Sequence, residues 1–138
     1  RADSLIRLSE ELKLAEKYMQ MEQRRLGERL LVSWQVSELP DGATILPLTL
    51  QPLLENAVAH GIQPSVEGGE VRVYGRREKD NIVIEISDKV ETKTRLKENK
   101  VILTPLEKRI GNDGIQRRNG TTTKHEGIHA PCFKSGNR

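Results

Sequence analysis

The 138-residue chain has the length of one domain, and with 35% hydrophobic but only 3% aromatic residues its core is expected to be aliphatic and modest. No apolar run approaches the roughly 20 residues that a membrane-spanning helix needs, and the first residues show no secretory signal pattern. The lone cysteine, Cys132, excludes an internal disulfide and is expected to be an ordinary thiol in a reducing compartment.

The net charge of +3 combines two segments of opposite sign. Residues 1–88 hold 11 Lys/Arg and 15 Asp/Glu, a net charge of −4, whereas residues 89–138 hold 12 and 5, a net charge of +7. A basic tail can attract nucleic acid, but this one has a single aromatic residue, Phe133, and no readout motif. Such binding would be salt-sensitive and blind to sequence, so we expect no specific nucleic-acid partner.

A helix is predicted over residues 4–26 because apolar residues recur at alternating steps of three and four. These residues are Leu5, Leu8, Leu12, Ala15, Met19 and Leu26. Gly27 is expected to end or weaken the helix. The apolar stripe can pack inside its own domain or against a partner helix, and the sequence leaves both open.

Strand patterns follow. Leu30–Val36 alternates with one apolar face, and Pro40–Gly42 is typical of a turn. Val71–Gly75 and Ile82–Asp88, joined by a charged connector, predict an antiparallel hairpin. The order helix, strand, helix, strand, strand predicts an α/β sandwich with a mixed, mostly antiparallel sheet and helices on one face. After Asp88 only Val101–Leu103, with Leu106, predicts one further short element.

The most informative segment is residues 50–61, which predicts a short helix with an apolar and a polar side. Its apolar side comprises Leu50, Leu53, Leu54, Ala57 and Val58. Its polar side comprises Gln51, Glu55, Asn56 and His60. Since Pro52 is tolerated only in the first turn, the helix should start near Leu50, with Thr49 as its cap and Gly61 as its stop signal. Its polar side should face a ligand or water.

This segment resembles the N-box of the GHKL ATP-binding fold, in the form found in LytS-type sensor histidine kinases. The matching residues are Leu50–Leu54, Glu55-Asn56-Ala57 and His60-Gly61-Ile62. The flanks are similar as well, with Tyr18–Glu22 and Arg25 in a preceding helix and Pro47 before the box. Arg25–Gly27 and Ser33–Val36 look closest to the alginate-regulation sensor branch. The resemblance implies a Bergerat-type α/β sandwich that binds ATP with Mg²⁺.

The resemblance also implies a role for each of five residues. Asn56 would give Mg²⁺ its side-chain oxygen, and Glu55 would act in catalysis by binding a metal-bound water or orienting a neighbour. His60 would touch phosphate or ribose, with Gly61 beside it in the nucleotide site. Asp88 would accept a hydrogen bond from the adenine amino group. Taken without the resemblance, Asn56, Glu55 and His60 could be ordinary helix-surface or packing residues, and Asp88 a turn residue at the end of a strand.

The chain departs from the family pattern in two places. Ala59 stands where many relatives carry a lysine that would meet a phosphate. Asp88 is followed by Lys89-Val90-Glu91 instead of the family's Asp-x-Gly-x-Gly box. Residues 111–118 lie where the second glycine-rich box is expected but match it poorly, so none of its roles is carried over. The tail is either a diverged lid or sequence foreign to the fold, in which case the sheet would lack its last strands.

Three segments are therefore expected. Residues 1–28 form a helix leading from the dimerisation and phosphoacceptor region, and residues 29–88 form the ATP-binding core. Residues 89–138 are a divergent basic tail, for which non-native sequence and disorder are both open. The resemblance implies a fragment of a two-component kinase that transfers a phosphoryl group from ATP to a histidine outside this chain. Implied partners are a cytoplasmic response regulator and a second copy of the parent protein, itself anchored in the bacterial inner membrane with this domain in the cytoplasm. The alternative is a GHKL remnant that acts as a non-catalytic dimerisation or interaction module.

Overall fold

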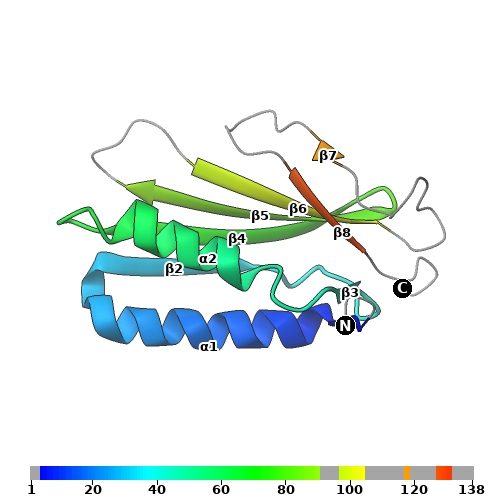
Figure 1. Ribbon diagram of the computed structural model, residues 1–138, viewed down its shortest axis with the longest axis horizontal. Helices are drawn as coiled ribbons and strands as arrows, with labels where there is room; N and C mark the ends of the chain where they lie inside the picture. Colours follow the sequence, from blue (N-terminus) through cyan, green and yellow to red (C-terminus); the bar gives the residue numbers. More distant parts are fainter. Residues whose placement is uncertain (1–3, 91–96, 105–116, 119–126, 132–138) are drawn as a thin grey trace.

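Two helical segments lie on one side of a mixed sheet in the computed structural model, which describes residues 4–90, 97–104, 117–118 and 127–131 (Figure 1). The helices are α1 (Leu8–Leu26), the 3₁₀ turn η1 (Gly27–Arg29), α2 (Gln51–Asn56) and the π-helical turn η2 (Ala57–Ile62). The strands are β1 (Ile6–Arg7), β2 (Leu30–Gln35), β3 (Thr44–Ile45), β4 (Gly69–Glu78), β5 (Asn81–Val90), β6 (Lys97–Thr104), β7 (Arg117–Arg118) and β8 (Gly127–Pro131). The α/β class with a mixed sheet is confirmed.

The helix α1 begins at Leu8, four residues later than predicted, and ends at Leu26. Ile6 and Arg7 instead pair with β3, and the Leu8 N–H donates to Ala43 O at 3.0 Å, so a tertiary contact overrides the local helical pattern. Gly27 ends the helix with a φ of +65°, as predicted. The apolar stripe packs inside the domain, because Leu8, Ala15 and Met19 are almost fully buried.

The centre of the sheet is the hairpin of β4 and β5, which pair antiparallel over their whole length from Gly69↔Val90 to Glu78↔Asn81. This confirms the predicted hairpin and lengthens it, since β5 continues two residues past Asp88. The strand β2 pairs parallel with β4, and β6 pairs antiparallel with β5. Within the described residues, the order of the main sheet is β2-β4-β5-β6-β8-β7.

Alternate residues of the central strands face the helices and form the core. These residues are Val71 and Val73 of β4, Ile82, Ile84 and Ile86 of β5, and Val101 and Leu103 of β6, each at most 1% exposed. Because Asp88 shares the parity of Ile84 and Ile86 along β5, its carboxylate lies on the helix-covered face of the sheet.

The chain after Asp88 contributes more to the sheet than the sequence indicated. The strand β6 has eight residues, and its Val101, Ile102 and Leu103 are fully buried. The predicted segment boundary at residue 88 falls inside β5 and stays a prediction. Most of residues 111–118, and Leu106, Cys132 and Phe133, lie outside the described residues. Among the described helical segments, none combines the length and apolar character needed to cross a membrane.

Candidate functional site

The segment Gln51–Ile62 folds as the α2 turn followed without a break by the π-helical turn η2. Pro52 lies in the first turn, as predicted. The predicted two-sidedness is also confirmed: the apolar side, from Leu50 to Val58, is buried, whereas Glu55, Asn56 and His60 are exposed. The apolar side therefore anchors the segment on the sheet, and the polar side is left for ligand or solvent.

The cap predicted for this helix is wrong. The Thr49 hydroxyl donates to Leu46 O at 2.7 Å, and no side chain of the residue before the helix caps it. Glu11 of α1 instead accepts the Leu50 N–H at 2.9 Å with Oε2 and the Leu48 N–H at 3.1 Å with Oε1. Glu11 was missed by sequence reasoning, although a signal existed: it lies between Leu8 and Ala15 at helical spacing, inside the apolar stripe.

Gly61 does not end the helix, so the predicted stop signal is also wrong. The π-helical turn continues to Ile62, and the Gln63 N–H donates to Val58 O at 2.8 Å. What Gly61 permits is the close approach of β5, since a Cβ at this position would lie 2.5 Å from Asp88 Oδ1. Any side chain at position 61 would therefore force the Asp88 carboxylate to move. π-Helical turns of this kind often mark functional sites.

A pocket of about 240 Å³ lies between the polar side of this segment and the sheet. Its lining residues are Leu53, Asn56, Ala57, His60, Ile86, Asp88 and Asn99. The fold thus brings together Asn56, His60 and Asp88, which the sequence singled out, with Gly61 in contact with Asp88. Glu55 does not line the pocket, and its Oε2 accepts a hydrogen bond from Gln51 Nε2 at 3.1 Å. The roles expected of all five residues stay predictions.

Asn99 is a pocket residue that sequence reasoning missed. It lies on β6 directly opposite Ile86 of β5. Residues 99, 101 and 103 share one face of a strand because side chains alternate, so the apolar run Val101–Leu103 carried a signal for it. The signal was not recognised, because the sequence did not show that this run pairs with β5.

The middle of α1 runs beside the polar side of α2. Partial burial raises the pKa of the Tyr18 hydroxyl, and the negative charges of Glu22 and Glu55 raise it further, whereas Arg25 lowers it. The phenol therefore stays neutral close to two carboxylates, one on each helix. Tyr18 belongs to the flanking motif, and the electrostatic influence of Glu55 indicates that this motif lies near the polar side of the box helix.

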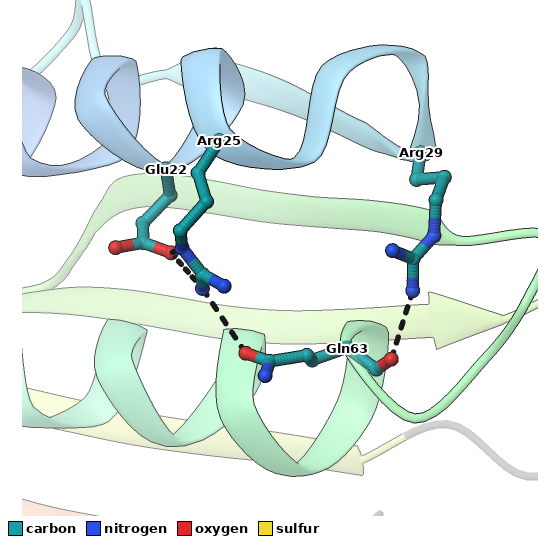
Figure 2. A network of polar contacts seen from close by, with 4 residues as sticks. All are labelled: Glu22, Arg25, Arg29 and Gln63. Carbon is teal, nitrogen blue, oxygen red and sulfur yellow. Dashed lines mark hydrogen bonds and ion pairs between the residues drawn. The ribbon is translucent and has the colours of Figure 1, made fainter.

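Two arginines, one at the end of α1 and one at the end of η1, connect these elements to the residues that follow η2 (Figure 2). Arg25, paired with Glu22, donates from Nη2 to Gln63 Oε1 at 3.0 Å. Arg29 donates from Nη2 to Gln63 O and to Ser65 O, each at 2.8 Å. Glu22 and Arg25 were part of the sequence resemblance, whereas Arg29 and Gln63 were not recognised.

No family model matches the chain, but comparison with known proteins identifies several sensor proteins as relatives. The chain is 31% identical over 88 residues to the sensor histidine kinase BtsS of Escherichia coli, and 27% identical over 129 residues to the sensor protein LytS of Staphylococcus saprophyticus. It is 38% identical over 71 residues to the sensor histidine kinase YpdA of Escherichia coli. These alignments cover 64%, 92% and 51% of the chain.

The chain is similar to sensor histidine kinases. It spans only 16% of BtsS, 20% of LytS and 12% of YpdA, a small part of each relative's length. The similarity therefore concerns one segment of these kinases, and it agrees with the kind of protein that the box residues indicated.

Proposed function

We propose that this chain is part of the GHKL-type ATP-binding catalytic domain of a two-component sensor histidine kinase, similar to the LytS type and closest to the alginate-regulation branch. One observation carries the proposal: the pocket that joins Asn56 and His60 on one side to Asp88 on the other, with Asp88 against Gly61. The similarity to sensor histidine kinases supports it.

The base of the nucleotide would bind at Asp88. Asp88 is only 9% exposed and lines the pocket, so a hydrogen bond from an exocyclic amino group to its carboxylate would be largely shielded from water. A pocket of about 240 Å³ is smaller than most whole-ligand sites. It would therefore hold the base, and the ribose and phosphates would extend outward past His60 and Asn56, which are exposed at the surface.

The Mg²⁺ that accompanies ATP would be held mainly by phosphate oxygens and water, with one or two protein oxygens. The exposed Asn56 amide offers one such oxygen at the rim of the pocket, so the residues present fit the ion. Bound Mg²⁺ would screen the triphosphate charge. Glu55, one residue before Asn56 and outside the pocket lining, would orient a water molecule or a neighbouring side chain rather than contact the base.

The wider role follows from the same proposal. The phosphoryl group would pass from ATP to a histidine outside this chain, and then to a cytoplasmic response regulator. The parent protein would be a homodimer anchored in the inner membrane, with this domain in the cytoplasm. The alternative of a non-catalytic dimerisation module gains no support from α1, because its apolar stripe is already buried in its own core.

Isothermal titration calorimetry with ATP and Mg²⁺ tests the proposal. We expect saturable binding that needs Mg²⁺ and weakens more than about 10-fold in Asn56→Ala, since one oxygen ligand of Mg²⁺ is lost. Asn81→Ala is the matched control, because Asn81 lies at the opposite end of β5 from Asp88. This variant should bind ATP and Mg²⁺ like the wild type. Absence of saturable binding, or binding indifferent to Mg²⁺ and to Asn56→Ala, would overturn the proposal.

A further inference from the structure

The segment that carries Asn56 and His60 is held at its N-terminal end by a buried carboxylate. Glu11 is 2% exposed, and its two oxygens accept the backbone N–H groups of Leu48 and Leu50. Leu48 has a φ of +62°, a region that is costly for a residue with a branched side chain. The path of the chain into α2 therefore depends on the two hydrogen bonds to Glu11.

The same segment is held at its C-terminal end by a guanidinium group (Figure 2). Arg29 binds the backbone carbonyls of Gln63 and Ser65, the residues that follow η2. Within the described residues Arg29 Nε is buried without a hydrogen-bond partner, which is a cost that the two carbonyl contacts must offset. Arg25 adds a contact to the Gln63 side chain.

The two contacts are matched in charge to the ends that they hold. The first N–H groups of a helix carry partial positive charge and its last carbonyls partial negative charge, so a carboxylate suits the first end and a guanidinium the second. This match in charge applies to Leu50 and Gln63, the two cap residues of the segment, whereas Leu48 and Ser65 lie just outside it. Glu11 and Arg29 come from two consecutive elements, α1 and η1, which meet at Gly27. Two consecutive elements thus hold the two ends of the segment whose Asn56 and His60 line the pocket.

We propose that Glu11 and Arg29 are positioning residues for the candidate nucleotide site: α1 and η1 clamp the segment Gln51–Ile62 at both ends and so set the pose of Asn56 and His60 against Asp88. This inference rests on the proposed function for its ligand. The clamp transmits any displacement of α1 relative to the sheet to the pocket, although neither Glu11 nor Arg29 lines it.

Hydrogen exchange of individual amides, followed by NMR in the full 138-residue chain, tests the clamp without nucleotide. The variants are Glu11→Gln and Arg29→Met, and the controls are Glu10→Gln and Arg24→Met, which change exposed residues of the same helix. In Glu11→Gln we expect the Leu50 amide to exchange about 10-fold faster or more, since a hydrogen bond to a charged group is lost. In Arg29→Met the Gln63 amide should respond similarly, with the β4–β5 hairpin and both controls unchanged.

Titration of the same proteins with Mg²⁺ and ATP gives the second measurement, the nucleotide affinity. Both clamp variants should bind at least 10-fold more weakly than the controls. Equal affinity in variants and controls would overturn the positioning role. Exchange that rises equally in the hairpin and in the segment Gln51–Ile62 would also overturn it, because both residues would then contribute only to overall stability. If the wild type binds no nucleotide, the proposed function fails, and local exchange still decides whether the clamp exists.

Discussion

Gly61 lies so close to Asp88 that the need for glycine at position 61 can be tested by mutation. Replacement of a helical glycine by alanine normally stabilises a protein by up to about 1 kcal/mol. Here the added methyl group would lie 2.5 Å from Asp88 Oδ1, so Gly61→Ala should instead lower the free energy of unfolding by about 1–3 kcal/mol. Urea denaturation measures the change, and the sign alone separates the two expectations.

A double-mutant cycle with Asp88→Ala identifies the cause. Removal of the carboxylate opens the space that the new methyl group needs, so Gly61→Ala should cost less than about 0.5 kcal/mol in that background. An equal cost in both backgrounds would show that backbone conformation, and not the contact with Asp88, requires glycine.

Tyr18 supplies a pH-dependent prediction. Burial first, then the charges of Glu22 and Glu55, raise the pKa of its hydroxyl above the ordinary value of 10.0 in the folded protein. A group whose pKa is raised on folding contributes stability below its unfolded pKa and loses it as pH rises through the folded value. Wild-type stability should therefore fall more steeply above pH 10 than that of Tyr18→Phe. Parallel stability curves from urea unfolding at several pH values would contradict this.

At the scale of elements, α1 has a buried and an exposed side, and one of its two methionines lies on each side. Met19 is 1% exposed, whereas Met21 is 61% exposed. Met19→Ala should destabilise the protein by about 2–5 kcal/mol, because it leaves a cavity between helix and sheet. Met21→Ala should change stability by less than about 0.5 kcal/mol. Similar losses at both positions in thermal unfolding would mean that α1 also buries its outer side, as a dimerisation helix would.

Local patterns predicted these elements well, and their ends poorly. The stripe of α1, the two sides of Gln51–Ile62 and the hairpin depend on periodicity, which sequence displays directly. The errors arose where a distant residue decided the outcome. Ile6 lies in β1 and pairs with β3 instead of beginning α1. Glu11, and not Thr49, accepts a backbone N–H at the start of the box helix. The close approach of Asp88 accounts for the glycine at position 61. None of these partners is within 25 residues of the position it determines.

At the scale of the whole molecule, the sequence predicted the architecture and three of the residues that meet at the pocket, but not the contribution of the chain after Asp88. Its basic, polar composition concealed β6, whose apolar residues are few but fully buried. The alignment with LytS covers 92% of the chain and therefore includes most of residues 89–138. Asn99, contributed by β6, could be placed in the pocket only once the pairing with β5 was known.

Truncation after Val90 tests how far the core depends on β6. The cut keeps β5 whole but removes Val101, Ile102 and Leu103, all fully buried. Burial of each contributes about 1.5–3 kcal/mol, a total comparable with the ~5–15 kcal/mol stability of a whole domain. The cut also turns β5 into an open sheet edge, which favours pairing with another copy. The shortened chain should therefore lose cooperative thermal unfolding and self-associate, as size-exclusion chromatography with light scattering would show.

A chain that ends at residue 131 is the control, since it keeps every strand of the described residues. It should unfold like the full chain and elute as a species of the same oligomeric state. If the chain cut at Val90 were instead monomeric and cooperatively folded, the core would not depend on β6. Asn99 would then be lost without loss of the core, and nucleotide binding by the shortened protein would measure how much the β6 side of the pocket contributes to the site.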